Sequence, residues 1–351
     1  MTAFHENDIG VAIAVQIADA GVGGGFRDRL QGNDFEGTEG GGLCLSAAQG
    51  DGGEGADAHD AKWLVAFHLL CGHDSERCVP WLNMFFADAA LSKRLERAEG
   101  FACREFAEAR RRLFPDSGSE WIECAGAYAV FDGVGAPTTQ TFGLGLFEEL
   151  EAASLEMMEK FFKQRHAVVN HEVSPHVGVA ALDLLCSRGY KPLELSNVMF
   201  RSIEAPQVSQ REDVRVRVTG EEEAELWADI SSRGWTHEHP ELVDFLKGMG
   251  VICAARKGSP CFLAEFDGQP GAAGVLSIHE GVALFAGAAT VPELRRRGLQ
   301  NALLEARMQY AFEQGCDLAM MVTEIGSDSQ RNAQRQGFQV GYTRVKWQLS
   351  P

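Results

Sequence analysis

The feature of this 351-residue sequence that most constrains its fold is the segment 289–304, A-T-V-P-E-L-R-R-R-G-L-Q-N-A-L-L. An apolar strand ends here in a tight turn, and a helical pattern begins near Gly298. The first backbone N–H groups of a helix have no internal partner and lie at the positive end of its dipole. Because Gly298 lets an anion approach the backbone and three arginines precede it, the segment predicts a pyrophosphate site.

The residues around this turn have the pattern of a mixed α/β domain. Asp267-Gly268 and Glu280-Gly281 are turn signals between three apolar strands and predict a meander. Segment 318–323, L-A-M-M-V-T, is continuously apolar and predicts a strand buried on both faces. The strands expected are 214–218, 260–266, 272–279, 282–289, 318–323 and 340–349, and the helices expected are 221–233, 240–249, 298–314 and 328–336.

The turn resembles the acetyl-CoA motif of the GCN5-related N-acetyltransferase (GNAT) superfamily, R/Q-x-x-G-x-G/A. Arg295-Arg296-Arg297-Gly298 matches its first four positions, and Gln300 stands in place of the last Gly or Ala. Gly337-Phe338 is similar to the G-F that follows the fourth helix of the family. The order of strands and helices over 213–351 also resembles one complete GNAT domain.

Residues 84–204 resemble a second, degenerate GNAT-like domain, joined to the first by a polar linker at 205–212. Its expected elements are helices 92–113, 148–165 and 177–188, and strands 121–131, 138–146, 167–173 and 193–203. The helix at 148–165 follows T-F-G-L-G-L-F, which lacks the arginines of the motif, so this half is not expected to hold coenzyme. The fold class expected is therefore a mixed α/β sheet with two GNAT-like domains in tandem.

Residues 1–83 differ from the rest, with glycine runs, an acidic stretch and no sustained hydrophobic period. We expect an irregular or disordered extension. Met84 immediately precedes the recognisable part, which suggests either a native start at Met84 or a genuine disordered arm.

The resemblance implies direct attack of a primary amine on acetyl-CoA. The site residues that it implies for the coenzyme are Ala289, Thr290, Val291, Arg295, Arg296, Arg297, Gly298, Leu299, Gln300, Asn301, Ala302 and Asn332. Backbone N–H groups of 289–291 would face the thioester carbonyl, whereas Asn332 could equally lie on a polar helix face.

Proton transfer is the least determined part of the expected chemistry. The family's usual acid, a tyrosine four residues before the G-F glycine, is replaced by Ala333. Tyr342, Tyr310, Ser329 or water could substitute, and Glu324, at the end of the buried strand, is the candidate base or else a solvated carboxylate. Trp235, between two helices, is either a wall of the acceptor pocket or a core anchor.

Composition excludes some other classes of function. With 32 basic against 50 acidic residues the formal charge is −18, so the chain gains no counterion-release energy on nucleic acid. No apolar run reaches the ~20 residues that span a bilayer. Nine scattered cysteines without C-x-x-C indicate free thiols in a reducing cytoplasm, and the single H-E-H at 237–239 is too sparse for a metal site.

These observations predict a cytoplasmic N-acetyltransferase, a monomer or homodimer, that uses acetyl-CoA and a small-molecule or protein amine, without metal, nucleic acid or membrane partners. The first half would be structural and could form a wall of the acceptor pocket. The alternative is a non-catalytic acyl-CoA-binding or regulatory module, which the missing tyrosine favours. A third reading is a different acyl donor, or aminoacyl transfer, on the same tandem fold.

Overall fold

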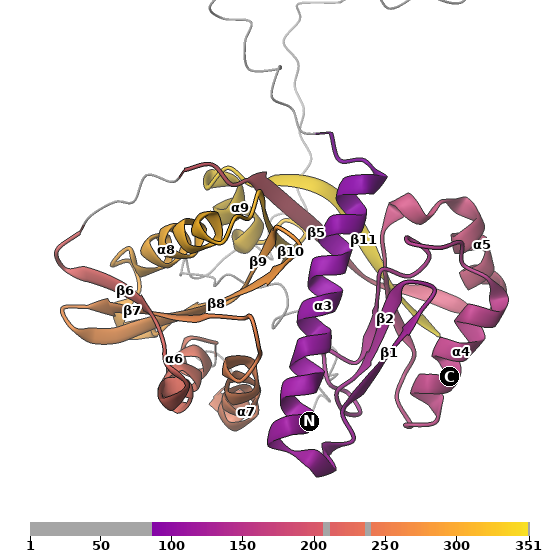
Figure 1. The fold of residues 1–351 in the computed structure, drawn as a ribbon, viewed down its shortest axis with the longest axis horizontal. Coiled ribbons are helices and arrows are strands. Elements are labelled where there is room, and N and C mark those ends of the chain that lie inside the picture. Colours follow the sequence, from indigo (N-terminus) through magenta and orange to yellow (C-terminus); the bar gives the residue numbers. More distant parts are fainter. Residues whose placement is uncertain (1–85, 206–210, 236–239, 350–351) are drawn as a thin grey trace, which may run out of the picture. The chain divides into compact units, whose positions relative to one another are not determined.

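The described residues of the computed structural model centre on one mixed sheet of eleven strands, in the order β1-β2-β3-β4-β11-β5-β10-β9-β8-β7-β6 (Figure 1). The strands are β1 Glu120–Cys124, β2 Ala127–Phe131, β3 Gln140–Phe142, β4 Asn170–Val173, β5 Tyr190–Ser202, β6 Val214–Val218, β7 Cys261–Phe266, β8 Gln269–His279, β9 Val282–Thr290, β10 Leu318–Glu324 and β11 Gln339–Leu349. The predicted class, a mixed α/β sheet, is confirmed.

The structure describes residues 86–205, 211–235 and 240–349. The predictions for residues 1–83, for most of the linker 205–212 and for the His-Glu-His loop at 236–239 lie outside these ranges. Within these ranges, residues from Ala87 onward form one compact unit by their contacts. No helix in this part of the chain is both long and apolar enough to cross a membrane.

The two halves of the chain exchange strands in the middle of the sheet. β5, from the first half, lies between β10 and β11 of the second half, with Met199 opposite Met321 in the antiparallel β5–β10 pair. β11 continues past β5 to pair with β4, where Val345 lies opposite Val173. Strand pairing therefore crosses the predicted boundary at 205–212, and the division into two domains stays a prediction.

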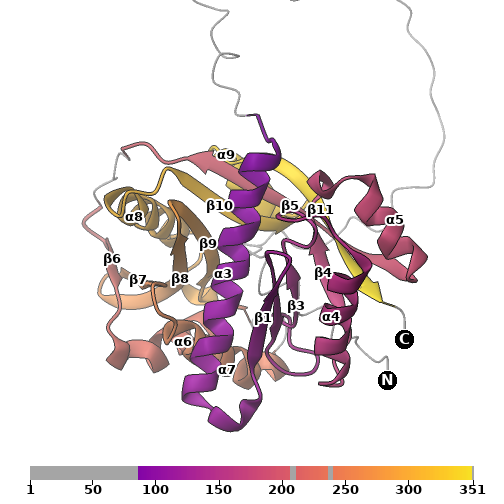
Figure 2. The same cartoon turned by 45° about the vertical axis from the view of Figure 1, so that its right-hand side comes forward.

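Helices cover both faces of the second half of the sheet. The helices are α3 Ala89–Leu113, α4 Ala152–Lys163, α5 Val179–Ser187, α6 Ala224–Trp235, α7 Val243–Ala254, α8 Leu299–Glu313 and α9 Asp328–Arg335. Side chains alternate along a strand, so Phe285 and Met321 pack with α8 and α9, whereas their neighbours Leu284 and Met320 pack with α3. Figure 2 shows α3 in front of the sheet and α8 on the left.

Most predicted elements are present, and three predictions need correction. The predicted strand 121–131 is two strands, because Ala125 and Gly126 both have positive φ and form a hairpin turn. The predicted strand 138–146 shrinks to β3, since Gly143 and Gly145 turn the chain. At the start of α9 the side-chain cap is Ser327, which accepts a hydrogen bond from the Gln330 N–H, and not Asp328.

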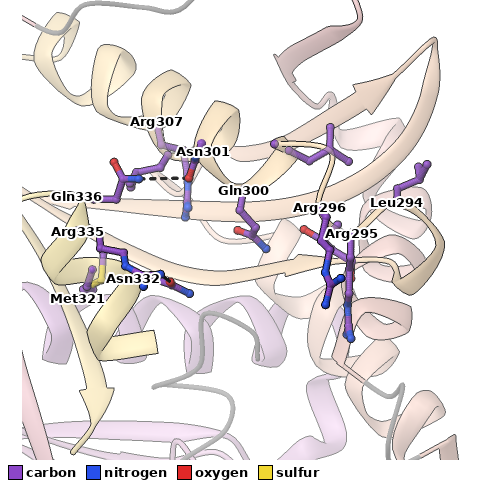
Figure 3. A pocket seen from close by; sticks show the side chains of 15 residues that line it. Leu294, Arg295, Arg296, Gln300, Asn301, Arg307, Met321, Asn332, Arg335 and Gln336 are labelled. Carbon is purple, nitrogen blue, oxygen red and sulfur yellow. Dashed lines mark hydrogen bonds between the residues drawn. The ribbon is translucent and has the colours of Figure 1, made fainter. Parts of the chain in front are cut away.

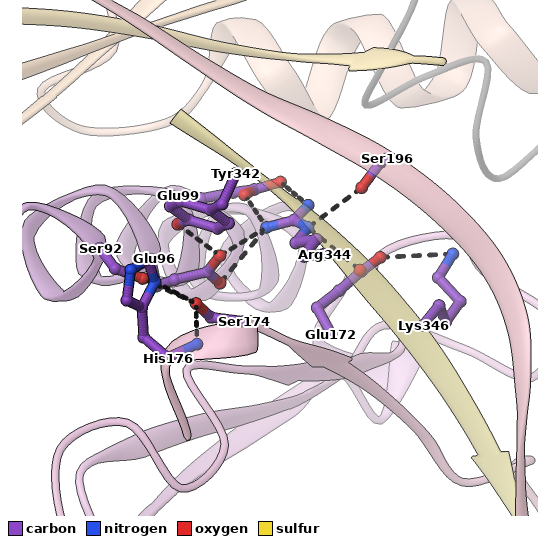
Figure 4. A network of polar contacts seen from close by, with 10 residues as sticks. All are labelled: Ser92, Glu96, Glu99, Glu172, Ser174, His176, Ser196, Tyr342, Arg344 and Lys346. Carbon is purple, nitrogen blue, oxygen red and sulfur yellow. Dashed lines mark hydrogen bonds and ion pairs between the residues drawn. The ribbon is translucent and has the colours of Figure 1, made fainter. Parts of the chain in front are cut away.

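A buried charge network joins α3 to β11 and β4 (Figure 4). Arg344 forms ion pairs with Glu96, Glu99 and Glu172, and its Nη2 donates to Glu99 Oε1 at 2.8 Å. Burial raises the pKa of Glu96 to about 7, although the Arg344 charge opposes this shift. Because Glu96 and Glu99 come from the first half and Arg344 from the second, the network fixes α3 of the first half against β11 of the second half.

Candidate functional site: two cavities beside strand β9

The site begins where two parallel strands part. β9 and β10 pair only over Val282–Leu284 and Leu318–Met320, and no further β9–β10 pair is present among the described residues. On its other edge β9 stays paired with β8 as far as Thr290, with an irregularity between Ala273 and Val275. One edge of β9 is therefore left open from Phe285 to Thr290.

The predicted turn follows directly and has the backbone conformation that its glycine requires. Arg296 and Gly298 both have positive φ, +62° and +83°, and α8 begins at Leu299. Gly298 is the N-cap residue, and no side chain among the described residues caps the first turn of α8. A Cβ at position 298 would overlap Nη1 of Arg211, which donates to the Arg297 carbonyl at 2.7 Å.

A cavity of about 360 Å³ opens between this turn, α8 and α9 (Figure 3). It is lined by Thr290, Leu294, Arg295, Arg296, Gly298, Leu299, Gln300, Asn301, Leu304, Arg307, Met321, Asn332, Ala333, Arg335 and Gln336. Four of these described residues are arginines and none is a carboxylate, in a chain of formal charge −18. We call this the arginine cavity.

The structure brings most of the predicted coenzyme residues to this cavity. Those that line it are Thr290, Arg295, Arg296, Gly298, Leu299, Gln300, Asn301 and Asn332. Ala289 is buried in β9, Val291 is buried just after the end of β9, and Ala302 is not among the lining residues. Arg297 is exposed, with its guanidinium 5.2 Å from the centre of the Phe266 ring.

Two buried polar atoms of the lining have no hydrogen-bond partner among the described residues: Thr290 Oγ1 and Gln300 Nε2. An unpaired buried polar group costs about 1–3 kcal/mol, so such atoms in a cavity wall indicate a ligand or an ordered water. Other lining groups are already engaged, since Asn301 accepts from Gln336 at 3.2 Å and Asn332 from Arg335 at 3.4 Å.

A second cavity, of about 130 Å³, lies on the face of the sheet that packs with α3, α6 and α7. It is lined by Glu99, Ala102, Cys103, Phe106, Pro137, Thr138, Gln140, Phe142, Trp227, Ser231, Trp235, Leu246, Met249, Gly250, Cys253, Arg256, Val275, Leu284, Ala286 and Gly287. Trp235 is thus placed in a cavity wall, together with residues of the first half. We call this the junction cavity, and it borders β9 on the open stretch.

The two predicted proton carriers lie elsewhere. Glu324 is exposed at the end of β10, and neither it nor Tyr342 is among the residues that line the two cavities. Tyr342 is buried against α3, and its hydroxyl donates to Glu96 Oε1 at 2.8 Å. Their roles as base and acid remain predictions. Ala333, at the position of the family's tyrosine, lines the arginine cavity.

Sequence reasoning missed Arg307 and Arg335 in the arginine cavity, and Glu99, Cys103 and Arg256 in the junction cavity. A signal was available for Arg307, because Gln300, Leu304 and Arg307 are spaced i, i+4, i+7 and share one face of α8. Nothing in the sequence joins α3 to α7, because that contact depends on tertiary packing.

A helix start without a side-chain cap among the described residues, beside an arginine-lined cavity on a mixed α/β sheet, is an arrangement that suits a phosphate-bearing ligand. Residues 222–338 match the model of the acetyltransferase (GNAT) family, and this part of the chain is a GNAT domain. The resemblance that the turn motif suggests is thereby confirmed.

Solved structures are similar over a larger part of the chain. A GCN5-related N-acetyltransferase from Kribbella flavida has a TM-score of 0.50 and 20% identity over 71% of this chain and 96% of its own. A GCN5-related N-acetyltransferase from Sphaerobacter thermophilus has a TM-score of 0.43 and 17% identity, covering 76% and 93%. A tandem GNAT protein from the clavulanic acid biosynthesis pathway has a TM-score of 0.48 and 11% identity, covering 76% and 98%. No curated protein that was compared with the chain matches it.

Proposed function

We propose that this protein is an N-acyltransferase that moves an acyl group from a CoA thioester to a primary amine. Acetyl-CoA is the donor with which other CoA thioesters are compared. The observation that carries the proposal is the arginine cavity, whose described lining has four arginines and no carboxylate at a helix start that no described side chain caps. CoA carries a pyrophosphate and a 3′-phosphate, and this combination of positive charge and helix-start N–H groups suits phosphate oxygens.

The residues present fit a CoA thioester. Gly298 and the first turn of α8 would hold the pyrophosphate, with Arg295 and Arg296 beside it. The orphaned atoms Thr290 Oγ1 and Gln300 Nε2 would bond polar groups of the pantetheine arm. The side chain of Gln300, which replaces the last small residue of the motif, would therefore act as a ligand and not as an obstruction.

The acceptor amine would occupy the junction cavity and reach the donor across the open edge of β9. The amine nitrogen attacks the thioester carbonyl carbon, the C–S bond breaks, the amine loses a proton and the thiolate gains one. Val291 N–H already donates to Gly271 O at 2.9 Å, on the β8 side. Since N–H directions alternate along a strand, the Thr290 N–H is directed to the open edge and is the proposed donor to the carbonyl oxygen.

For the proton, Glu324 at the end of β10 is the proposed acceptor, acting through water because it lines neither cavity. We assign no catalytic role to Tyr342, because its hydroxyl is bonded to Glu96 on the α3 face.

Calorimetric titration with CoA and acetyl-CoA tests binding, and thiol release with a panel of primary amines tests turnover. The proposal expects both. Binding without turnover with any amine would contradict the transferase and favour the acyl-CoA-binding module, which the alanine at position 333 also favours.

A further inference from the structure

Arg307 lines the arginine cavity, and no carboxylate among the described residues neutralises its charge, although its guanidinium lies 5.1 Å from the centre of the Phe285 ring. Its side chain is only 1% exposed on α8. Nη1 donates to the carbonyls of Val275 at 3.1 Å and Ala286 at 3.3 Å, and Nε donates to Leu303 O at 3.2 Å. Space for the guanidinium exists because residue 274 is glycine, where a Cβ would lie 3.2 Å from Arg307 Cζ.

No carboxylate of the described residues forms an ion pair with Arg307, and Nη2 donates to none of them. Burial lowers the pKa of Arg307 to about 10, so the side chain stays charged at neutral pH. Carbonyl dipoles satisfy hydrogen bonds but do not neutralise the charge, and an unpaired ion in the interior costs several kcal/mol. In contrast, the equally buried Arg344 has three glutamates around it.

Arg307 lies at the end of the cavity that an acyl group would reach. Gln300, Leu304 and Arg307 line the cavity along one face of α8. Arg307 is nine residues beyond Gly298, about 13 Å along the helix at 1.5 Å per residue. Because Arg307 bonds the Ala286 carbonyl, this end of α8 lies over the stretch of β9 from which β10 has parted. A ligand with phosphates at Gly298 and an extended arm along α8 would bring its acyl end to Arg307.

We propose that Arg307 binds a carboxylate at the end of the acyl group, so that the preferred donor is the CoA thioester of a dicarboxylic acid. The inference rests on the proposed function and refines its donor. A guanidinium and a carboxylate make strong charge-assisted hydrogen bonds, and the carboxylate would neutralise the buried charge. Acetyl-CoA fits the same cavity but leaves Arg307 unpaired, which makes it the weaker ligand.

The test measures dissociation constants by calorimetry for succinyl-CoA, acetyl-CoA and CoA. The wild-type protein is expected to bind succinyl-CoA at least tenfold more tightly than acetyl-CoA. Arg307→Met is expected to remove this ratio by weakening succinyl-CoA alone, and Arg307→Lys to keep part of it. The matched control, Arg296→Met at the phosphate end of the same cavity, is expected to weaken all three ligands and keep the ratio.

Equal wild-type affinity for succinyl-CoA and acetyl-CoA would overturn the inference and leave the proposed function intact. An equal loss of affinity for both thioesters in Arg307→Met would also overturn the inference. Arg307 would then only support the irregular β8–β9 pairing between Ala273 and Val275. If Arg307→Met does not fold, the wild-type ratio and Arg307→Lys still decide. Failure of folded wild-type protein to bind all three ligands would contradict the proposed function itself.

Discussion

Substitution of Gly298 tests whether the start of α8 binds the phosphates of CoA. The left-handed backbone at +83° costs an ordinary residue roughly 1–2 kcal/mol. A Cβ would also displace Nη1 of Arg211 from the Arg297 carbonyl, a loss of about 1 kcal/mol. We therefore expect Gly298→Ala to lower the free energy of unfolding by about 2–3 kcal/mol. Gly298→Asp adds a negative charge beside the ligand's phosphates and should weaken CoA binding more than tenfold, about 1.4 kcal/mol.

The helix itself offers a matched control. Gly315, just beyond the other end of α8, has φ +75°, and no atom of the described residues lies within 4 Å of a Cβ built there. Gly315→Ala should show the backbone strain in urea unfolding but leave the CoA dissociation constant unchanged. In an Arg211→Ala background, Gly298→Ala should cost only the strain. A folded Gly298→Asp protein with wild-type affinity for CoA in calorimetry would refute the reasoning.

Three further outcomes are expected. Trp235→Ala should raise the KM for the amine without changing the CoA dissociation constant, and a change in CoA affinity alone would contradict its place in the junction cavity. Burial raises the pKa of Glu96 to about 7 in the folded protein. At pH values between its ordinary pKa and 7, folding is therefore accompanied by the uptake of a proton. Stability in urea should therefore fall as pH rises from 5 to 7, and less so in Glu96→Gln; identical slopes would contradict this. Because arginines line the cavity, added salt should weaken CoA binding in calorimetry, and an affinity independent of salt would contradict their role.

Local signals in the sequence predicted the elements that carry the proposed donor site. The turn at Gly298, the start of α8 and the buried strand β10 depend on residues close together in the chain, so periodicity and turn chemistry were sufficient. The hairpin between β1 and β2 was missed because Ala125-Gly126 lies within one apolar run.

Non-local pairing is what the sequence could not predict. The insertion of β5 between β10 and β11 depends on register between strands more than 100 residues apart. The junction cavity likewise needs α3 beside α7, and Glu99 of its wall is bonded to Arg344 of β11, a contact between distant parts of the chain. The sequence places Arg307 on one face of its helix, but only its burial under the sheet carbonyls shows that no described carboxylate pairs with it.

The stoichiometry of CoA binding tests the central claim most directly. The arginine cavity lies in the second half of the chain, and the first half lacks the arginine turn, so calorimetric titration should give one CoA per chain. Loss of that binding in Gly298→Asp would assign the bound CoA to the start of α8. Two CoA per chain, or none bound to folded protein, would contradict the account.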